Sequence, residues 1–188
     1  MDDPIEALTS GDDEQAEATI PQIIAQGTSI FPALTELLSS PDPDQRWWAL
    51  RAMAELDEPD VPALLVAALE DPDRSVRQCA ALGLRLKPDP GGIEGLIESM
   101  QGQDPLLSSL AADALVAIGE PAVPALLDAL SGGSPSARLQ AVRALALIGD
   151  RRAIPALFAA LEDQSSLVQY WAENGLEKMG VGMTFFKP

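Results

Sequence analysis

Apolar residues recur along the chain in a pattern that repeats about every 31 residues. One half of each period carries an apolar residue followed by Pro-Ala-Leu, and the four clear copies begin at Phe31, Val61, Val123 and Ile154. A weaker copy without proline begins at Ile93. Proline is favoured in the first turn of a helix, because its missing N–H would have no intrahelical partner there. Each copy therefore predicts the first helix of a repeat.

A second signature, Ala-x-x-(Ala/Gly)-(Leu/Met), follows each copy about seventeen residues later. Small residues at positions i and i+3 let neighbouring helices approach closely, while the large residue behind them fills the remaining space. Gly119, Gly149 and Gly180 follow this signature, where a helix commonly ends in a left-handed residue. The pattern predicts a second helix in each repeat, and so five helical hairpins. The first alanines of the signature, here the key alanines, are Ala49, Ala80, Ala111, Ala141 and Ala172.

The five predicted repeats occupy residues 28–57, 58–88, 89–119, 120–149 and 150–180. Residues 1–27 match the repeat poorly, with weaker helices over 4–9 and 13–25, and we interpret them as an N-terminal cap with the polar outer face that a terminal repeat needs. The tail, residues 181–188, is apolar and aromatic. It either folds back onto the last hairpin as a cap or docks elsewhere through Phe185 and Phe186.

The stretch from Asp73 to Leu84 resembles the second helix of a HEAT repeat, Asp-x-x-Val-Arg-x-x-Ala-x-x-Ala-Leu. The short repeats look most like the phycobilisome-lyase subgroup of HEAT proteins. This resemblance implies an all-α fold, a right-handed α-solenoid of about five HEAT hairpins plus an N-terminal helical cap, with the second helices on the concave face. The arginine position of the HEAT pattern holds Arg46, Arg77, Ser108, Arg138 and Gln169.

Charge limits the classes of partner. The net charge is −17, and the first 45 residues carry ten acidic side chains without a Lys or Arg. This excess repels phosphate backbones, so we expect no nucleic acid partner, whereas a cationic surface on a protein would be steered toward the acidic end. It also maintains solubility without any partner.

Several kinds of chemistry and location are not supported by the sequence. The absence of His rules out the usual Ser-His-Asp and Cys-His arrangements, and no phosphate-binding glycine loop occurs. One Cys without His makes a zinc site implausible, so we expect no metal and no cofactor. Apolar runs such as 61–69 are too short to span a bilayer and no signal segment opens the chain, so a cytoplasmic location is expected. Cys79 is expected to be a partly exposed, inert filler.

Helical phase selects candidate binding residues on the second helices. Positions two before and two after each key alanine are about half a turn away from the core, and the position just before it lies at the margin. Large aromatics and arginines on an exposed face are the residue types that dominate binding hot spots. In an alternative interpretation, Trp48 and Trp171 pack against adjacent helices and only Trp47 and Tyr170 are exposed. The candidates are Trp47, Trp48, Arg51, Leu82, Leu139, Arg143, Tyr170 and Trp171.

Two further arginines, Arg151 and Arg152, open the first helix of the fifth repeat, where the helix dipole disfavours cations. They suggest either an external partner or pairing with Asp150 or Asp128. The sequence does not separate these alternatives.

The sequence favours a non-catalytic scaffold or assembly factor that binds another protein on its concave face. The family resemblance adds a phycobiliprotein or a photosynthetic assembly component as the class of partner. The alternative that it implies is a bilin lyase subunit or bilin chaperone, in which an aromatic groove with arginines holds an open-chain tetrapyrrole by stacking and by pairing with its propionates. Isomerising members of that lyase group carry a His-Cys-Cys run that this chain lacks.

Overall fold

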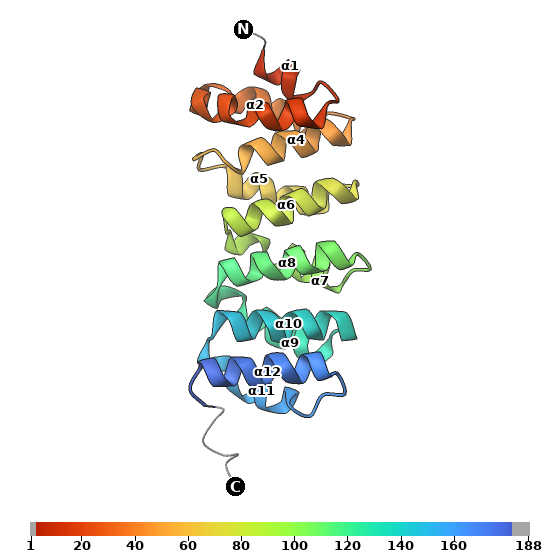
Figure 1. Cartoon of the computed structure of the whole chain (residues 1–188), viewed down its shortest axis with the longest axis vertical. Helices are drawn as coiled ribbons and strands as arrows, with labels where there is room; N and C mark the ends of the chain where they lie inside the picture. Colours follow the sequence, from red (N-terminus) through yellow and green to blue (C-terminus); the bar gives the residue numbers. More distant parts are fainter. Residues whose placement is uncertain (1–2, 182–188) are drawn as a thin grey trace. The chain divides into compact units, whose positions relative to one another are not determined.

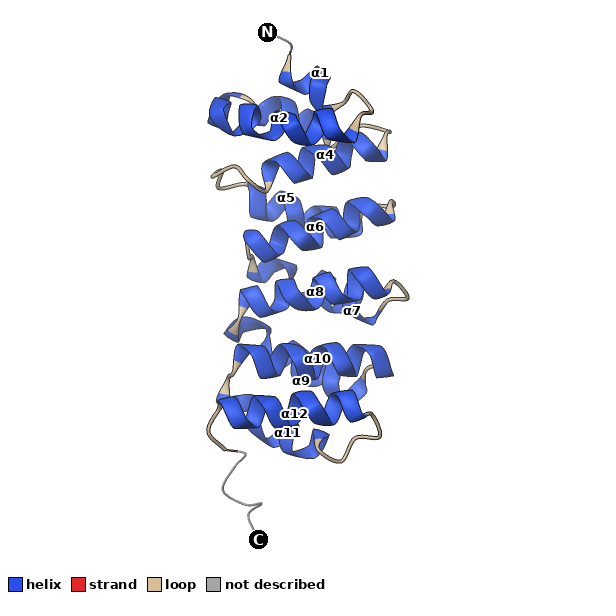
Figure 2. Ribbon diagram, in the orientation of Figure 1, coloured by secondary structure: helices blue, strands red, loops and turns tan. Residues whose placement is uncertain are grey.

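The computed structural model describes residues 3–181, and these residues form twelve α-helices joined by loops and short 3₁₀ turns, with no strand among them (Figure 2). The predicted all-α class is therefore confirmed. The chain divides into two compact units, Met1–Asp89 and Pro90–Pro188, here called the N-terminal and the C-terminal unit.

In the N-terminal unit, α2 packs against α4 and α4 packs against α6, and Figure 1 shows these three helices in succession. Each second helix is paired with a shorter first helix, since α3 contacts α4 and α5 contacts α6. Two helices are found where the weaker N-terminal pattern predicted them. The elements are α1 (Pro4–Leu8), α2 (Asp13–Gln26), α3 (Phe31–Leu37), α4 (Pro43–Met53), α5 (Val61–Ala67) and α6 (Arg74–Leu86).

The C-terminal unit repeats this arrangement. Its second helices α8, α10 and α12 pack in order, and the first helices α7, α9 and α11 contact them. A 3₁₀ turn precedes each of these first helices, which the sequence pattern did not predict. The elements are α7 (Ile93–Gln101), α8 (Pro105–Ile118), α9 (Val123–Gly132), α10 (Pro135–Ile148), α11 (Ile154–Ala160) and α12 (Ser166–Lys178).

Local residues explain where the second helices begin and end. The carboxylate of Asp73 accepts a hydrogen bond of 2.8 Å from the backbone N–H of Ser75, and Asp104 caps α8 in the same way. Such side chains satisfy N–H groups that lack a partner within the helix. At the other end, Gly149 follows α10 with φ of 72°, a left-handed conformation that glycine adopts at little energetic cost.

The core of each unit depends on the small residues that the repeat pattern identified. All five key alanines are completely buried. A Cβ added at Gly175 would lie 2.8 Å from the Cβ of Ala146 and 3.0 Å from its Cα, so α12 approaches α10 as closely as a glycine permits. A Cβ at Gly83 would instead meet the end of the Leu65 side chain, 2.6 Å from Cδ2.

Within residues 3–181, no helix is by itself long and apolar enough to cross a membrane. The segments Pro105–Ile118 and Glu120–Gly132 reach the length and apolar composition of a membrane span only when they are taken together, and they are bent by 119° at the break between them.

Candidate protein-binding faces

The arginine position of the repeat makes a hydrogen bond within its own hairpin in four of the five hairpins. In three hairpins the side chain at this position donates a hydrogen bond to a carbonyl six residues earlier, in the loop between the first and second helices, and Ser108 donates to a carbonyl in the last turn of α7. Gln can replace Arg because the bond needs one N–H donor and no charge. The bonds join Arg46 Nη1 to Ser40 O (2.9 Å), Arg77 Nη1 to Asp71 O (2.7 Å), Gln169 Nε2 to Asp163 O (2.7 Å) and Ser108 Oγ to Met100 O (2.8 Å).

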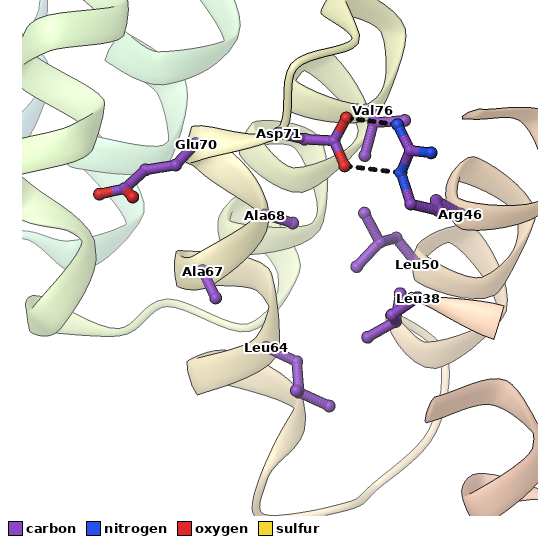
Figure 3. A pocket seen from close by; sticks show the side chains of 9 residues that line it. All are labelled: Leu38, Arg46, Leu50, Leu64, Ala67, Ala68, Glu70, Asp71 and Val76. Atoms are coloured by element: carbon purple, nitrogen blue, oxygen red, sulfur yellow. Dashed lines mark hydrogen bonds and ion pairs between the residues drawn. The ribbon is translucent and has the colours of Figure 1, made fainter. Parts of the chain in front are cut away.

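Arg46 and Arg138, both at the arginine position, form an ion pair with a carboxylate 25 residues later. Arg46 binds Asp71 through two parallel bonds of 2.8 Å, with both side chains 12% exposed (Figure 3). The hydrogen bond from Arg46 is the main reason why the pKa of Asp71 is lowered, and the same bond raises the pKa of Arg46. Arg138 makes a longer contact of 3.3 Å with Asp163. These arginines therefore join successive hairpins within their own unit.

A cavity of about 290 Å³ lies beside the Arg46 pair in the N-terminal unit. Its lining is mostly aliphatic, and Figure 3 shows Glu70 pointing away from the ion pair. Because both carboxylate oxygens of Asp71 accept bonds from Arg46, the pair does not offer an unpaired charge to a ligand in this cavity.

The first candidate face lies on α4. Trp47 and Trp48 form an edge-to-face pair, with ring centroids 4.7 Å apart and planes at 83°. Trp48 is 8% exposed and braces the half-buried Trp47. The two rings line an open depression of about 420 Å³, whose other lining residues are Asp13, Glu17, Asp44 and Ser75.

Arg51 lies on the same helix and is held by two carboxylates. Its Nη2 lies 2.7 Å from Glu17 Oε1 on α2, and its Nη1 lies 2.9 Å from Glu55. The guanidinium of Arg51 therefore bridges α2 and α4, two second helices of the N-terminal unit. The remaining candidate of this unit, Leu82, lies on α6 and is half-buried.

The second candidate face lies on α10 and α12 of the C-terminal unit. Tyr170 is 55% exposed and contacts Trp171 edge to face, with ring centroids 5.5 Å apart. Arg143 on α10 lies 2.7 Å from Asp113 on α8 and also donates to Gln140. The last candidates are half-buried: Leu139 and Trp171.

The structure gives these candidates positions but no partner, so the eight residues stay predictions. Within each unit the more exposed aromatic ring contacts a second ring. An arginine, one helical turn along in the N-terminal unit and on the neighbouring helix in the C-terminal unit, is held by a carboxylate. The aromatics of the tail, Phe185 and Phe186, lie outside the described residues.

The expectation that Cys79 is partly exposed is wrong. Its side chain is buried on α6, with Sγ 3.6 Å from the carbonyl oxygen of Trp47. Burial raises the pKa of this thiol to about 12, so almost no thiolate forms at neutral pH. The close packing of α6 on α4 covers a position that helical phase alone placed at the margin of the core.

Arg152 pairs with Asp150, as one of the two interpretations expected. Its Nη2 lies 2.6 Å from Asp150 Oδ2 and also donates to the carbonyl of Glu120. The hydrogen bonds from Arg152 are the main reason why the pKa of Asp150 falls to about 2. Arg151 is exposed, and none of the described residues hydrogen-bonds or ion-pairs with its side chain. The pair explains Arg152 without an external partner.

The HEAT-repeat model matches residues 1–85, 61–132 and 123–182, which together span nearly the whole chain. The chain belongs to the HEAT-repeat family. The "Phycobilisome maturation protein" of Synechococcus elongatus is 38% identical over 119 residues, covering 61% of this chain and 56% of the relative. The "Phycocyanobilin lyase subunit beta" of a Nostoc species is 36% identical over 112 residues, covering 59% and 55%.

The matched region thus spans little more than half the length of these two curated relatives. The solved complex of the two subunits of phycocyanin lyase from Nostoc is similar in fold, with a TM-score of 0.58 over 94% of this chain and 76% of the other at 21% identity. The chain is therefore a helical-repeat protein related to phycobilisome lyase and maturation proteins.

Proposed function

We propose that the protein is a non-catalytic assembly factor that binds a phycobiliprotein during its maturation, through the faces of its second helices. The observation that carries this proposal is Tyr170, a large aromatic that is 55% exposed yet fixed in place by contact with Trp171. A rigid aromatic anchor loses little conformational freedom on binding, which is why such residues dominate protein interfaces. The names of the relatives supply the class of partner.

The alternative is a bilin lyase subunit or bilin chaperone. A bilin on these faces needs cations for its two propionates. Arg51 and Arg143 are the candidate cations, and their guanidinium groups already contact carboxylates at 2.7 Å. A propionate would have to share a charge that a carboxylate already compensates, which favours a protein partner over a pigment.

Titration of purified apo-phycocyanin subunits with the protein tests the proposal. Wild type should bind, and Tyr170→Ala should raise the Kd about tenfold or more, the loss typical of a hot-spot residue. Its melting temperature should stay close to that of wild type, because the ring is largely exposed. Phe158→Ala is the matched control, since Phe158 is an aromatic of α11 that is 42% exposed. It should bind like wild type.

Two results would count against this function. Absence of binding by wild type, or an equal loss in Phe158→Ala, would remove the α12 face as the binding site. Phycocyanobilin added to the mixture separates the alternatives, because pigment that becomes covalently attached to the apo-subunit only when this protein is present would establish a lyase. Binding of the apo-subunit without any covalent attachment of the pigment supports the assembly factor.

A further inference from the structure

The depression in the N-terminal unit has both an aromatic wall and an acidic rim. Trp47 and Trp48 line it from α4, and three of its other four lining residues are acidic. Asp13 and Glu17 lie one turn apart on α2, so they present their carboxylates on the same side of that helix. Asp44 is one turn before Trp47 and Trp48 on α4. The lining includes no basic residue.

The rim already accepts a guanidinium. Glu17 binds Arg51 of this chain at 2.7 Å, and Arg51 itself is not among the residues that line the depression. Asp13 and Asp44 have no cationic partner among residues 3–181. Two carboxylates at the mouth are therefore uncompensated, in a part of the chain whose first 45 residues lack any Lys or Arg.

The aromatic wall suits the same chemical group. In an edge-to-face pair each indole keeps at least one face free of the other ring, and burial of Trp48 keeps the pair rigid. A guanidinium stacks on an indole face while its N–H groups bond carboxylates in the ring plane, a combination that an ammonium group matches less well. The volume of about 420 Å³ lies within the range of ligand pockets.

We infer that this depression is a receptor for an arginine side chain presented by a basic segment of the partner protein. The inference rests on the proposed function and specifies the chemistry of the partner. The guanidinium stacks on Trp47 and bonds Asp13 and Asp44. Propionate and phosphate groups are repelled by the two uncompensated carboxylates, so neither a bilin nor a nucleic acid fits this site.

The test uses a fluorescent Gly/Ser peptide carrying spaced arginines, titrated into the full chain at physiological salt. The double variant Asp13→Asn/Asp44→Asn should raise the Kd about tenfold, and Trp47→Ala should do so to a similar degree. Trp47→Phe keeps an aromatic face and should retain most of the affinity, which guards against a fold defect in the alanine variant. A peptide with lysine in place of arginine should bind more weakly.

Glu36→Gln/Glu58→Gln is the control, because it removes the same charge from the N-terminal unit at residues outside the depression. It should change the Kd by less than about twofold, as expected for distant charges screened by salt. An equal loss in this control, or no binding of the peptide by wild type, would overturn the inference. If the arginine peptide does not bind but apo-phycocyanin does, the inference fails and the proposed function stands. If the peptide binds but apo-phycocyanin does not, the proposed function fails and the arginine site stands.

Discussion

The two compact units use the same repeat and expose different surfaces. In the N-terminal unit the aromatic pair lines an acidic depression, and its most exposed member, Trp47, is half-buried. In the C-terminal unit Tyr170 is largely exposed, and Arg143 is held by Asp113 on α8. The repeat determines which helical positions lie on the face, while Asp13 and Glu17 of the adjacent helix α2 make the N-terminal face acidic.

The two units also differ in the ion pairs that join their hairpins. The Arg46 pair has two short bonds and is largely buried, whereas Arg138 makes one contact of 3.3 Å with its own side chain 29% exposed. The difference allows the units to be compared by substitution at equivalent positions.

The largest effect is expected at this arginine. Arg46→Ala should lower the free energy of unfolding by about 3 kcal/mol, because it removes both charge-assisted bonds from the largely buried carboxylate of Asp71, which among the described residues keeps only the backbone N–H of Asp73 as a donor. Arg138→Ala should lower it by about 1 kcal/mol, as expected for a more exposed pair. Urea denaturation followed by circular dichroism measures both values. Equal losses would show that geometry and burial of the pair do not govern its contribution.

A smaller effect is expected at the glycines of the second helices. Gly175→Ala should destabilise the protein by about 2 kcal/mol, because overpacking against Ala146, whose backbone Cα lies 3.0 Å from the new Cβ, outweighs the gain in helix propensity. Gly83→Ala should be near neutral, since Leu65 can rotate its side chain and the propensity gain offsets the strain. Thermal melts of both variants test this order, and a greater loss at Gly83 would contradict it.

The prediction with the smallest effect on stability concerns the reactivity of one thiol. Cys79 should react with an aromatic disulfide reagent at pH 8 at least about a hundredfold more slowly than a free thiol, because it is buried and its raised pKa keeps it protonated. Leu110→Cys in a Cys79→Ala background places a thiol at the equivalent, half-buried position of α8 and should react faster. Rapid labelling of native Cys79 would mean that α6 separates readily from α4.

The sequence predicted the hairpins well because their determinants are local. The proline of the first helices, the aspartate caps and the small residues of the second helices are read within a few positions of one another. The pairing of Arg152 with Asp150 was also within reach, since the two residues are near neighbours.

What the sequence did not reveal depends on neighbouring helices. Burial of Cys79 requires α4 to lie over it, and the bond between Arg51 and Glu17 joins residues 34 positions apart. The pair of Arg46 and Asp71 had a signal that could have found it, because an aspartate stands 25 positions after Arg46 and again after Arg138. After Arg77, the equivalent position is Gly102.

The arginine position has an evolutionary consequence. Its bond to a carbonyl six residues earlier lies inside one hairpin and travels with any duplicated segment, whereas its ion pair is divided between two hairpins. A hairpin therefore keeps the bond that holds its own turn wherever it stands in the array, whereas its ion pair forms only where the neighbouring hairpin supplies the other charge. Insertion or loss of one hairpin would thus leave the turns intact and change only the ion pairs at the new junction.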